Sequence, residues 1–466
     1  MSEVLTAIAD VIGEGVRIDE LTRTNYGRDW WARSALATWL GEGDELPMAV
    51  IFPRDTGQLA KTVRICRAAG VRMVPRGAGS GVCGGVLADG RSVVLSTDLL
   101  EGLRAFDPYD HVATFGAGTI GSDAEAAVAE RGFTIGHWPQ SIDRSSVGGW
   151  VATRASGQYS TGYGNIEDLV YSLEAVLPDG TVFRSKDTPR ASAGPDLKHL
   201  LIGSEGTLGI VTEVSFSIRP RPEQSVRQAF HFENFAAGIE ATREVIVPGW
   251  RPNVVRLYDA RESARHFRDS CPSGRCMLIF LHEGPAPRAE AEAEAVRALC
   301  RRHGGQPGDP AAVDAWFEHR NEVPSWRQLF EDGLVVDTIE VATGWSRLVP
   351  LYEAVITALQ AETSLMAASA HSSHAYQSGA NLYFTFVTSP ERSSEMIEVY
   401  DRCWELAMRA TRDVGASIAH HHGIGRVRRD WLPGEIGPAG VRMLRSVKRV
   451  LDPDDLMNPG VLIPTG

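Results

Sequence analysis

The sequence lacks several features that would indicate particular classes of protein. Its six cysteines include no CxxC pair, so we predict neither a disulfide framework nor a zinc or iron–sulfur site. No apolar run reaches the length of a membrane span. Its 47 Lys and Arg residues are outnumbered by 59 Asp and Glu residues, which leaves no basic excess for general nucleic-acid binding. The start, MSEVLTAIADVIGEG, has no basic residue, so we expect no secretory signal and a cytoplasmic protein.

Alternating strand and helix patterns indicate an α+β protein of several domains. Strands are predicted at 48–53, 71–75, 92–96, 111–116 and 210–218, with a hairpin over 169–185, a helix capped by Asp55 that ends at Ala69, and a helix over 121–132. After 220–224 the predicted strands lie at 226–232, 252–258, 276–282, 334–341 and 379–388, and the helices near 234–246, 287–302, 345–361, 392–414 and 441–450. The predicted domains are a helical arm at 1–45, a first domain at 46–220, a second at 221–410 and a C-terminal segment at 411–466.

Three glycine-rich segments lie in the first domain. The segment Pro139–Asp168 contains few large aliphatic side chains, so it would make a poor core but a good wall for a planar cofactor that carries phosphates. The segment 75–81, PRGAGSG, follows a predicted strand and matches neither GxGxxG nor a P-loop, yet its N–H groups suit a pyrophosphate. In the segment 203–210, Glu205 stands between glycines and is able to bind ribose hydroxyls. Each segment alone is compatible with an ordinary turn, but together they predict a flavin site.

The second half of the chain contains the candidates for chemistry. Three consecutive histidines, His420–His422, precede Gly-Ile-Gly, which predicts a loop whose backbone presses against a flat group. No carboxylate or cysteine lies at ligand spacing, so a metal site is the weaker interpretation and a general acid or base the stronger one. Arg256 stands among aliphatics and needs a partner or an anionic ligand. On the sequence alone, Tyr383 is a core aromatic, Arg327 a solvated charge, and His371 and His374 are ordinary polar residues.

These segments resemble, in order, blocks of the vanillyl-alcohol-oxidase-type (PCMH-type) flavoproteins. The blocks are VGGWVATRASG at 147–157, GSEGTLGIVTEV at 203–214 and HHHGIGRVRRDWL at 420–432. Within that superfamily the chain is most similar to the alkyldihydroxyacetonephosphate synthases. The resemblance implies a two-part FAD-binding PCMH-type domain, an α+β cap or substrate domain, and a C-terminal helical return to the active site.

The resemblance also implies roles for individual residues. Arg256, Tyr383 and His420, His421 and His422 are the implied catalytic residues, and Arg256 and Arg327 bind substrate, with Arg426 as a further candidate. The implied contacts to FAD come from Pro75, Arg76, Gly77, Ala78, Gly79, Ser80, Gly81, Gln140, Ser141, Ile142, Asp143, Arg144, Ser145, Ser146, Thr153, Arg154, Ala155, Ser156, Glu205, Gly206, Thr207, Leu208, Gly209, Ile210 and Val211. The pyrophosphate loop has no His where some relatives attach FAD covalently, so we expect a non-covalent flavin.

Two activities follow from the resemblance. The first exchanges the acyl group of acyl-dihydroxyacetone phosphate for a long-chain alcohol through an adduct at flavin N5. The second is a 2-hydroxyacid dehydrogenase or oxidase of the D-lactate or glycolate type, whose pyrophosphate loop the segment 75–81 resembles more. A flavin-binding protein without catalysis is a third interpretation. We expect a small-molecule or lipid-precursor substrate and no nucleic acid; peripheral membrane contact and homodimerisation stay open.

Overall fold

The computed structural model describes residues 3–43, 45–322 and 324–464, and the chain divides into two compact units. The first unit combines Met1–Ser156, Asn165–Pro220 and His421–Gly466. The second unit combines Gly157–Gly164 with Arg221–His420. The C-terminal segment therefore returns to the unit in which the chain begins, and the imidazole block is divided between His420 and His421.

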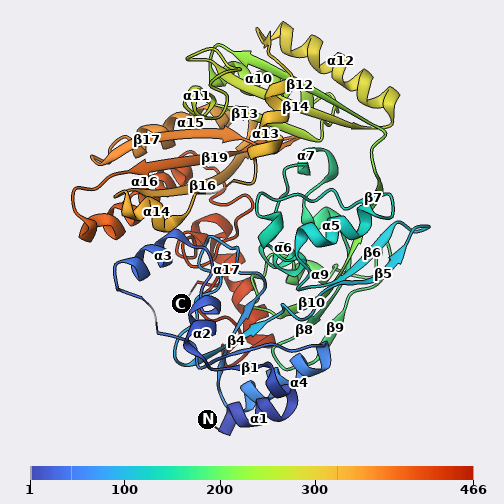
Figure 1. Ribbon diagram of the computed structural model, residues 1–466, viewed down its shortest axis with the longest axis vertical. Coiled ribbons are helices and arrows are strands. Elements are labelled where there is room, and N and C mark those ends of the chain that lie inside the picture. Colours follow the sequence, from blue (N-terminus) through green and yellow to red (C-terminus); the bar gives the residue numbers. More distant parts are fainter. Residues whose placement is uncertain (1–2, 44, 323, 465–466) are drawn as a thin grey trace. The chain divides into compact units, whose positions relative to one another are not determined.

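A small, mostly parallel sheet forms one part of the first unit (Figure 1). Its strand order is β1 (Val16–Arg17), β2 (Ala49–Ile51), β4 (Ser92–Ser96), β3 (Arg72–Arg76), and the last three strands are parallel. The adjoining helix α4 (Thr56–Ala68) begins at Asp55, whose carboxylate accepts the N–H of Gln58 at 2.8 Å, as the sequence predicts. Helix α1 (Glu3–Ile12) packs on α4 and buries Ile8 completely, so the predicted N-terminal arm belongs to this core.

A second, antiparallel sheet forms the other part of the first unit. Its order is β5 (Leu103–Asp107), β6 (Val112–Gly116), β10 (Ile210–Ser217), β8 (Val170–Val176), β9 (Val182–Arg184). Helix α6 (Val147–Thr153) packs on β10 and places Val147, Trp150 and Val151 in the core with Phe216. The expectation that the segment Pro139–Asp168 makes a poor core is therefore wrong for α6. Its apolar residues are few, but they share one side of a short helix.

The first unit also contains shorter elements and a long C-terminal helix. The long helix is α17 (Leu432–Leu451), which is kinked at Gly437. The other elements are η1 (Gly13–Gly15), α2 (Glu20–Tyr26), α3 (Ala32–Trp39), α5 (Gly121–Ala129), β7 (Phe133–Thr134), η2 (Ile142–Arg144), α8 (Ile166–Leu169), α9 (Lys198–Leu201) and β11 (Arg219–Pro220).

One large antiparallel sheet organises the second unit. Its order is β15 (Gln306–Pro307), β12 (Gln224–Phe232), β14 (Cys276–Gly284), β13 (Val254–Tyr258), β17 (Leu365–Ser372), β19 (Gly379–Thr388), β16 (Val335–Gly344), and β18 (Ala375–Tyr376) pairs with β19. Strand β17 is absent from the predicted strands. Its sequence, LMAASAHS, has no β-branched residue and is extended because both edges pair with neighbours.

A layer of helices packs on this sheet (Figure 1). The layer consists of α12 (Ala286–Arg302), α10 (Phe235–Ile246), α15 (Trp345–Leu359) and α16 (Met396–Asp413), each packed on the next. Leu257 of β13 points toward this layer, because a Cβ on Gly238 of α10 would lie 2.4 Å from it. Since side chains alternate along a strand, Arg256 and Tyr258 point to the opposite face. The remaining elements are α7 (Ser160–Tyr163), α11 (Ala260–His266), α13 (Ala311–His319), α14 (Trp326–Glu331) and η3 (Ser393–Glu395).

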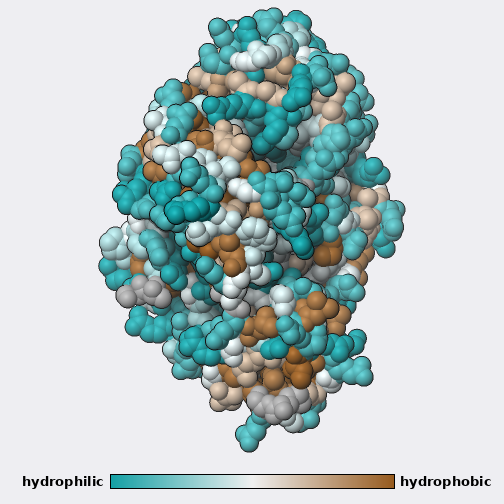
Figure 2. Space-filling view, turned by 60° about the vertical axis from the view of Figure 1, so that its left-hand side comes forward, coloured by the Kyte–Doolittle hydropathy of each residue, from teal (hydrophilic) through white to brown (hydrophobic). Residues whose placement is uncertain are grey.

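The visible surface is mostly hydrophilic, and the cysteines are buried. Hydrophilic side chains predominate on the face shown in Figure 2, and hydrophobic ones form scattered patches. None of the helices over the described residues is long and apolar enough to cross a membrane. The six cysteines all lie within the described residues, all are buried, and no disulfide joins them.

Candidate functional site

The glycine-rich segments of the first unit converge on one another. Ala78 donates its backbone N–H to the Ser146 hydroxyl at 3.4 Å, and a Cβ on Gly77 would lie 2.4 Å from the same oxygen. A Cβ on Gly206 would lie 3.0 Å from the Pro75 ring. Glu205 donates its N–H to the carbonyl of Ala152 at 2.8 Å. The three segments thus meet as the sequence predicts, and glycine is required where they touch.

The loop at 79–81 offers donors to an anion. The backbone N–H groups of Gly79, Ser80 and Gly81 have no hydrogen-bond partner among the described residues, and all three residues are half-buried. By contrast, the first N–H groups of α6 are satisfied by Thr119, Ala117 and the Ser146 cap. Unpaired N–H groups in a turn form a concave site for phosphate oxygens. The residues of this unit therefore fit a dinucleotide, and the loop, not the helix end, would hold its pyrophosphate.

Glu205 has two hydrogen-bond partners that the sequence does not predict. Its carboxylate accepts the backbone N–H groups of Ile424 at 2.7 Å and Gly425 at 2.8 Å. Burial raises the pKa of Glu205 to about 7, although these two hydrogen bonds oppose the shift. The nearby carboxyl of Asp29, which accepts the N–H groups of Trp31 and Val86, has its pKa raised to about 7 by burial as well. The Glu205 side chain therefore anchors the C-terminal segment, and its contact with a ribose stays a prediction.

The Gly-Ile-Gly loop does not press its backbone against a flat ligand at Gly425. A Cβ at that position would lie 2.0 Å from the carbonyl oxygen of Cys83. The close approach is therefore between two backbone segments of the first unit. Arg428 is fully buried beneath this loop and donates to the Cys83 sulfur at 3.0 Å and to the carbonyl of Gly423 at 2.9 Å.

The other predicted FAD contacts differ in exposure. Arg76 lies 4.1 Å from the Tyr26 ring centroid and donates to the carbonyl of Gly77, so its guanidinium is held on its own loop. Arg144 is exposed and lies 4.9 Å from the Trp30 ring centroid. Gln140, Asp143 and Arg154 are exposed; Ile142, Ser145, Ser146, Ser156, Glu205, Gly206, Thr207, Leu208, Gly209, Ile210 and Val211 are buried; Ser141, Thr153 and Ala155 are intermediate. Ligand contacts for these residues stay predictions.

In the second unit, Arg256 lies on the face of the sheet away from the helix layer. Its Nε donates to the Tyr258 hydroxyl at 2.7 Å, and its Nη2 lies 3.0 Å from Nε2 of His371. Two aromatic rings flank the guanidinium, with the Tyr258 centroid at 5.5 Å and the Trp316 centroid at 5.4 Å. Among the described residues Arg256 has no ion pair. The Arg256 guanidinium is therefore a fixed cation with no anionic partner in the described part of the second unit.

Tyr383 is in register with this group across the sheet. On β19 it stands opposite His371 of β17 and Glu340 of β16, and His371 stands opposite Tyr258 of β13. Directly opposed residues share a face, so these side chains form one row. The Tyr383 hydroxyl donates to Thr338 at 3.0 Å. Burial raises the pKa of Tyr383, so its phenol stays protonated at neutral pH and is a hydrogen-bond donor and not a base.

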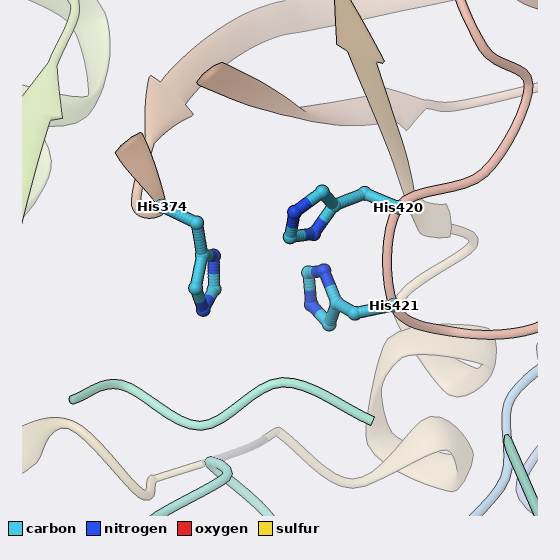
Figure 3. A group of neighbouring side chains, drawn as sticks. All are labelled: His374, His420 and His421. Atoms are coloured by element: carbon cyan, nitrogen blue, oxygen red, sulfur yellow. The ribbon is translucent and has the colours of Figure 1, made fainter. Parts of the chain in front are cut away.

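His420 and His374 lie together in the second unit, and Figure 3 draws them with His421, the next residue along the chain. Their ring centroids are 5.0 Å apart. His420 Nε2 lies 2.7 Å from the Tyr376 hydroxyl, and its backbone N–H is donated to Glu340 at 3.3 Å. His374 is buried and bonds to Ser373 and Gly157, and burial lowers its pKa well below the usual value. His374 is therefore neutral and fixed, and His420 is held by a tyrosine.

Arg327 and Arg426 have other partners, whereas a ring nitrogen of His421 lies within 4.8 Å of those of His374 and His420. His421 and His422 are partly exposed in the first unit. Arg327 is 82% exposed on α14 and is paired with Glu331 at 2.9 Å, one helical turn away. Arg426 donates to the carbonyls of Leu87 and Pro459. Arg256, Tyr383 and His420 are thus gathered in one unit, whereas Arg327 stands on an exposed helix turn.

Several residues of this region are absent from the predicted set. They are Glu262, Trp316, His371, His374 and Tyr376. His371 and His374 stand in AHSSHAY, where only the alternation of a strand could have marked them as neighbours of the site. Trp316 lies on α13, far from Arg256 in sequence, so only the tertiary structure brings the two together.

The glycine-rich loops of the first unit fit a flavin dinucleotide, and the matches to two family models show a flavin-dependent oxidoreductase-type protein. Residues 47–186 match the FAD binding domain, and residues 221–462 match the C-terminal domain of FAD linked oxidases. The chain belongs to the FAD-linked oxidase family, and FAD is its cofactor. The predicted α+β fold with a PCMH-type FAD domain is confirmed.

Individual relatives cover most of the chain. The uncharacterized FAD-linked oxidoreductase YgcU of Escherichia coli O157:H7 is 36% identical over 434 residues, 90% of this chain and 89% of the relative. An alkyldihydroxyacetonephosphate synthase of Caenorhabditis elegans is 29% identical, over 91% and 77%. Glycolate oxidase subunit GlcD of Bacillus subtilis is 26% identical, over 89% and 88%. A solved alkyldihydroxyacetonephosphate synthase has a TM-score of 0.82 at 23% identity, over 98% of this chain and 85% of that one, which shows the shared fold.

Proposed function

We propose that the protein is an alkyldihydroxyacetonephosphate synthase-like flavoenzyme. It would exchange the acyl group of acyl-dihydroxyacetone phosphate for a long-chain alcohol. The observation that carries the proposal is the Arg256 guanidinium. Tyr258 and His371 bind two of its nitrogens, and the Trp316 ring lies beside it. It has no anionic partner among the described residues. The 29% identity to the C. elegans synthase and the HHHGIG block at 420–425 support it.

Each of the site residues would have its own role in the reaction. Arg256 would bind the phosphate of the substrate through charge-assisted hydrogen bonds. Tyr383, whose phenol stays protonated, would move its hydrogen bond from Thr338 to the substrate. An imidazole of the block at 420–422 would remove the proton from the carbon that bears the ester. When bound, the flavin would supply an electrophilic ring.

A 2-hydroxyacid dehydrogenase or oxidase is the second candidate. The identity to the B. subtilis glycolate oxidase subunit favours it, as does the glycine-rich loop at 75–81. In this scheme Arg256 would bind a carboxylate and an imidazole would take the hydroxyl proton. The same residues serve both schemes, so the substrate has to separate them.

An anaerobic titration of the yellow holoenzyme distinguishes the two activities. We expect D-lactate and glycolate to leave the spectrum of the oxidised flavin unchanged. Acyl-dihydroxyacetone phosphate with a long-chain alcohol should then yield the ether product and free fatty acid, measured by mass spectrometry. Rapid bleaching by either hydroxy acid would establish the dehydrogenase, and a protein that neither contains nor takes up FAD would contradict both.

A further inference from the structure

Two of the three nitrogens of the Arg256 guanidinium have hydrogen-bond partners. Nε and Nη2 are engaged by Tyr258 and His371, and Cζ lies 5.5 Å from the Tyr258 ring centroid and 5.4 Å from that of Trp316. Its Nη1 group has no hydrogen-bond partner among the described residues. The orientation of the remaining edge therefore depends on the two groups that hold Nε and Nη2.

His371 is itself held by a buried carboxylate. Its Nδ1 lies 2.7 Å from Oε2 of Glu262, whose side chain is 1% exposed. The other oxygen of this carboxylate, Oε1, accepts the hydroxyls of Ser369 at 3.2 Å and Thr385 at 3.3 Å. The imidazole stacks on the Tyr383 ring at a centroid distance of 4.7 Å and an angle of 21°. The His371 imidazole is thus restrained along its edge by Glu262 and on its face by Tyr383.

The carboxylate determines the tautomer of His371. Burial opposes ionisation of Glu262, but the hydrogen bond from His371 and the charge of Arg265 overcome it and hold the pKa of Glu262 below its ordinary value. Burial lowers the pKa of His371 despite this carboxylate, so the imidazole is neutral at physiological pH. A carboxylate only accepts, so Nδ1 of His371 carries the proton, and Nε2 offers its lone pair to the N–H of Arg256.

We propose that Glu262 and His371 are positioning residues, which hold the Arg256 guanidinium with its Nη1 edge directed at the anionic group of the substrate. The proposal rests on the proposed function, because it concerns the cation to which that function assigns the substrate. A neutral histidine suits the role because it is able to accept a hydrogen bond from a cation and donate one to a carboxylate at the same time. Lys in place of Arg256 would lack the fixed fork of donors that this arrangement orients.

The test measures anion binding without turnover. Inorganic phosphate and acetate are titrated calorimetrically into the FAD-loaded enzyme and its variants, since phosphate represents the synthase substrate and acetate the hydroxy acid. His371→Leu should weaken binding of the preferred anion at least tenfold. His371→Gln keeps one donor and one acceptor on a side chain of similar length and should stay within threefold of wild type. His319→Leu removes another histidine paired with a glutamate, at 2.9 Å on the surface of the same unit, and should change nothing.

A second variant separates the loss of the oriented hydrogen bond from an effect of side-chain packing. Glu262→Gln keeps the shape of the side chain but is able to donate to Nδ1, which would reverse the tautomer and turn an N–H toward Arg256. We expect it to weaken anion binding as much as His371→Leu while flavin content and melting temperature stay near wild type. With an active substrate, both variants should raise KM more than they lower kcat.

Three outcomes would overturn the proposal. They are wild-type affinity in His371→Leu, equal losses in His371→Gln and His371→Leu, and a wild-type enzyme that binds neither anion. The proposed function fails separately, if the wild-type enzyme binds phosphate as expected but forms no ether product.

Discussion

The carboxylate of Glu205 accepts the backbone N–H of Gly425 at 2.8 Å, across 220 positions of sequence. This hydrogen bond joins the third glycine-rich segment to the loop that follows the histidine block. Asn458 adds to the connection, because its side-chain amide donates to the carbonyls of Glu205 at 2.7 Å and Gly85 at 3.0 Å. The C-terminal segment is therefore fixed to the proposed flavin loops by polar groups that water does not reach.

The first prediction concerns the pH dependence of this connection. Burial raises the pKa of Glu205 to about 7, whereas the carboxyl titrates near its ordinary value in the unfolded chain. Between these two values the folded state binds a proton that the unfolded state has lost. The contribution of Glu205 to stability is thus fully present below about pH 4.5 and declines as pH rises through 7, by an amount on the order of 3 kcal/mol.

Glu205→Gln removes this titration. We expect the melting temperature of the wild-type holoenzyme to fall more steeply between pH 5 and pH 8 than that of Glu205→Gln, by differential scanning calorimetry. Glu353→Gln, on an exposed position of α15, is the control and should follow wild type. Parallel curves for wild type and Glu205→Gln would show that Glu205 is not the titrating group.

The second prediction tests the contact between two glycine-rich segments. A Cβ on Gly77 would lie 2.4 Å from the Ser146 hydroxyl, so Gly77→Ala should displace the loop at 75–81 and weaken FAD binding about tenfold or more. Ser146→Ala removes the obstructing oxygen, and the next atoms stand 3.7 and 3.8 Å from that Cβ, which is ordinary contact. The double variant should therefore bind FAD more tightly than Gly77→Ala.

The measurement is the amount of FAD released on heat denaturation for each mole of protein, with dissociation constants from reconstitution of the apoprotein. Gly434→Ala is the matched control, since nothing lies within 4 Å of the position that its added methyl group would occupy. If Gly77→Ala keeps its full complement of FAD, the loop at 75–81 does not carry the cofactor.

The fold is largely predictable because its signals are local. The Asp55 cap, the Pro178-Asp179-Gly180 turn between β8 and β9, and the helix at 286–302 each depend on residues close in sequence. Strand β17 escapes prediction because pairing on both edges, and not its own composition, makes it extended. Such pairing depends on tertiary structure.

The candidate site is predictable only in part, for a similar reason. Arg256 stands out because a charge within an aliphatic strand is unusual. The groups that orient it are remote in sequence, with His371 lying 115 positions away. The flanking glycines suggest a ribose ligand for Glu205, but nothing in the sequence marks the two backbone N–H groups that its carboxylate accepts.

The third prediction identifies the cation that binds the substrate anion. Arg256→Ala should raise KM about 30-fold or more, because a hydrogen bond to a charged group contributes roughly 2–3 kcal/mol. Arg327→Ala should leave KM unchanged, since Arg327 is exposed and already paired with Glu331. Steady-state kinetics with the active substrate measure both variants. The reverse result would assign the anion to Arg327, in agreement with the family resemblance.

The fourth prediction concerns the three histidines at 420–422. His420 is held by the Tyr376 hydroxyl at 2.7 Å, whereas His421 begins the segment that returns to the first unit. We expect His421→Ala to abolish turnover while it retains FAD, because it removes the acid or base and leaves the flavin loops intact. His199→Ala, an exposed histidine of the first unit, should behave as wild type. Turnover and flavin content are measured together for His420→Ala, His421→Ala and His422→Ala. Activity that survives in all three single variants would remove the imidazoles from the reaction, and the proton would then have to be taken by another group.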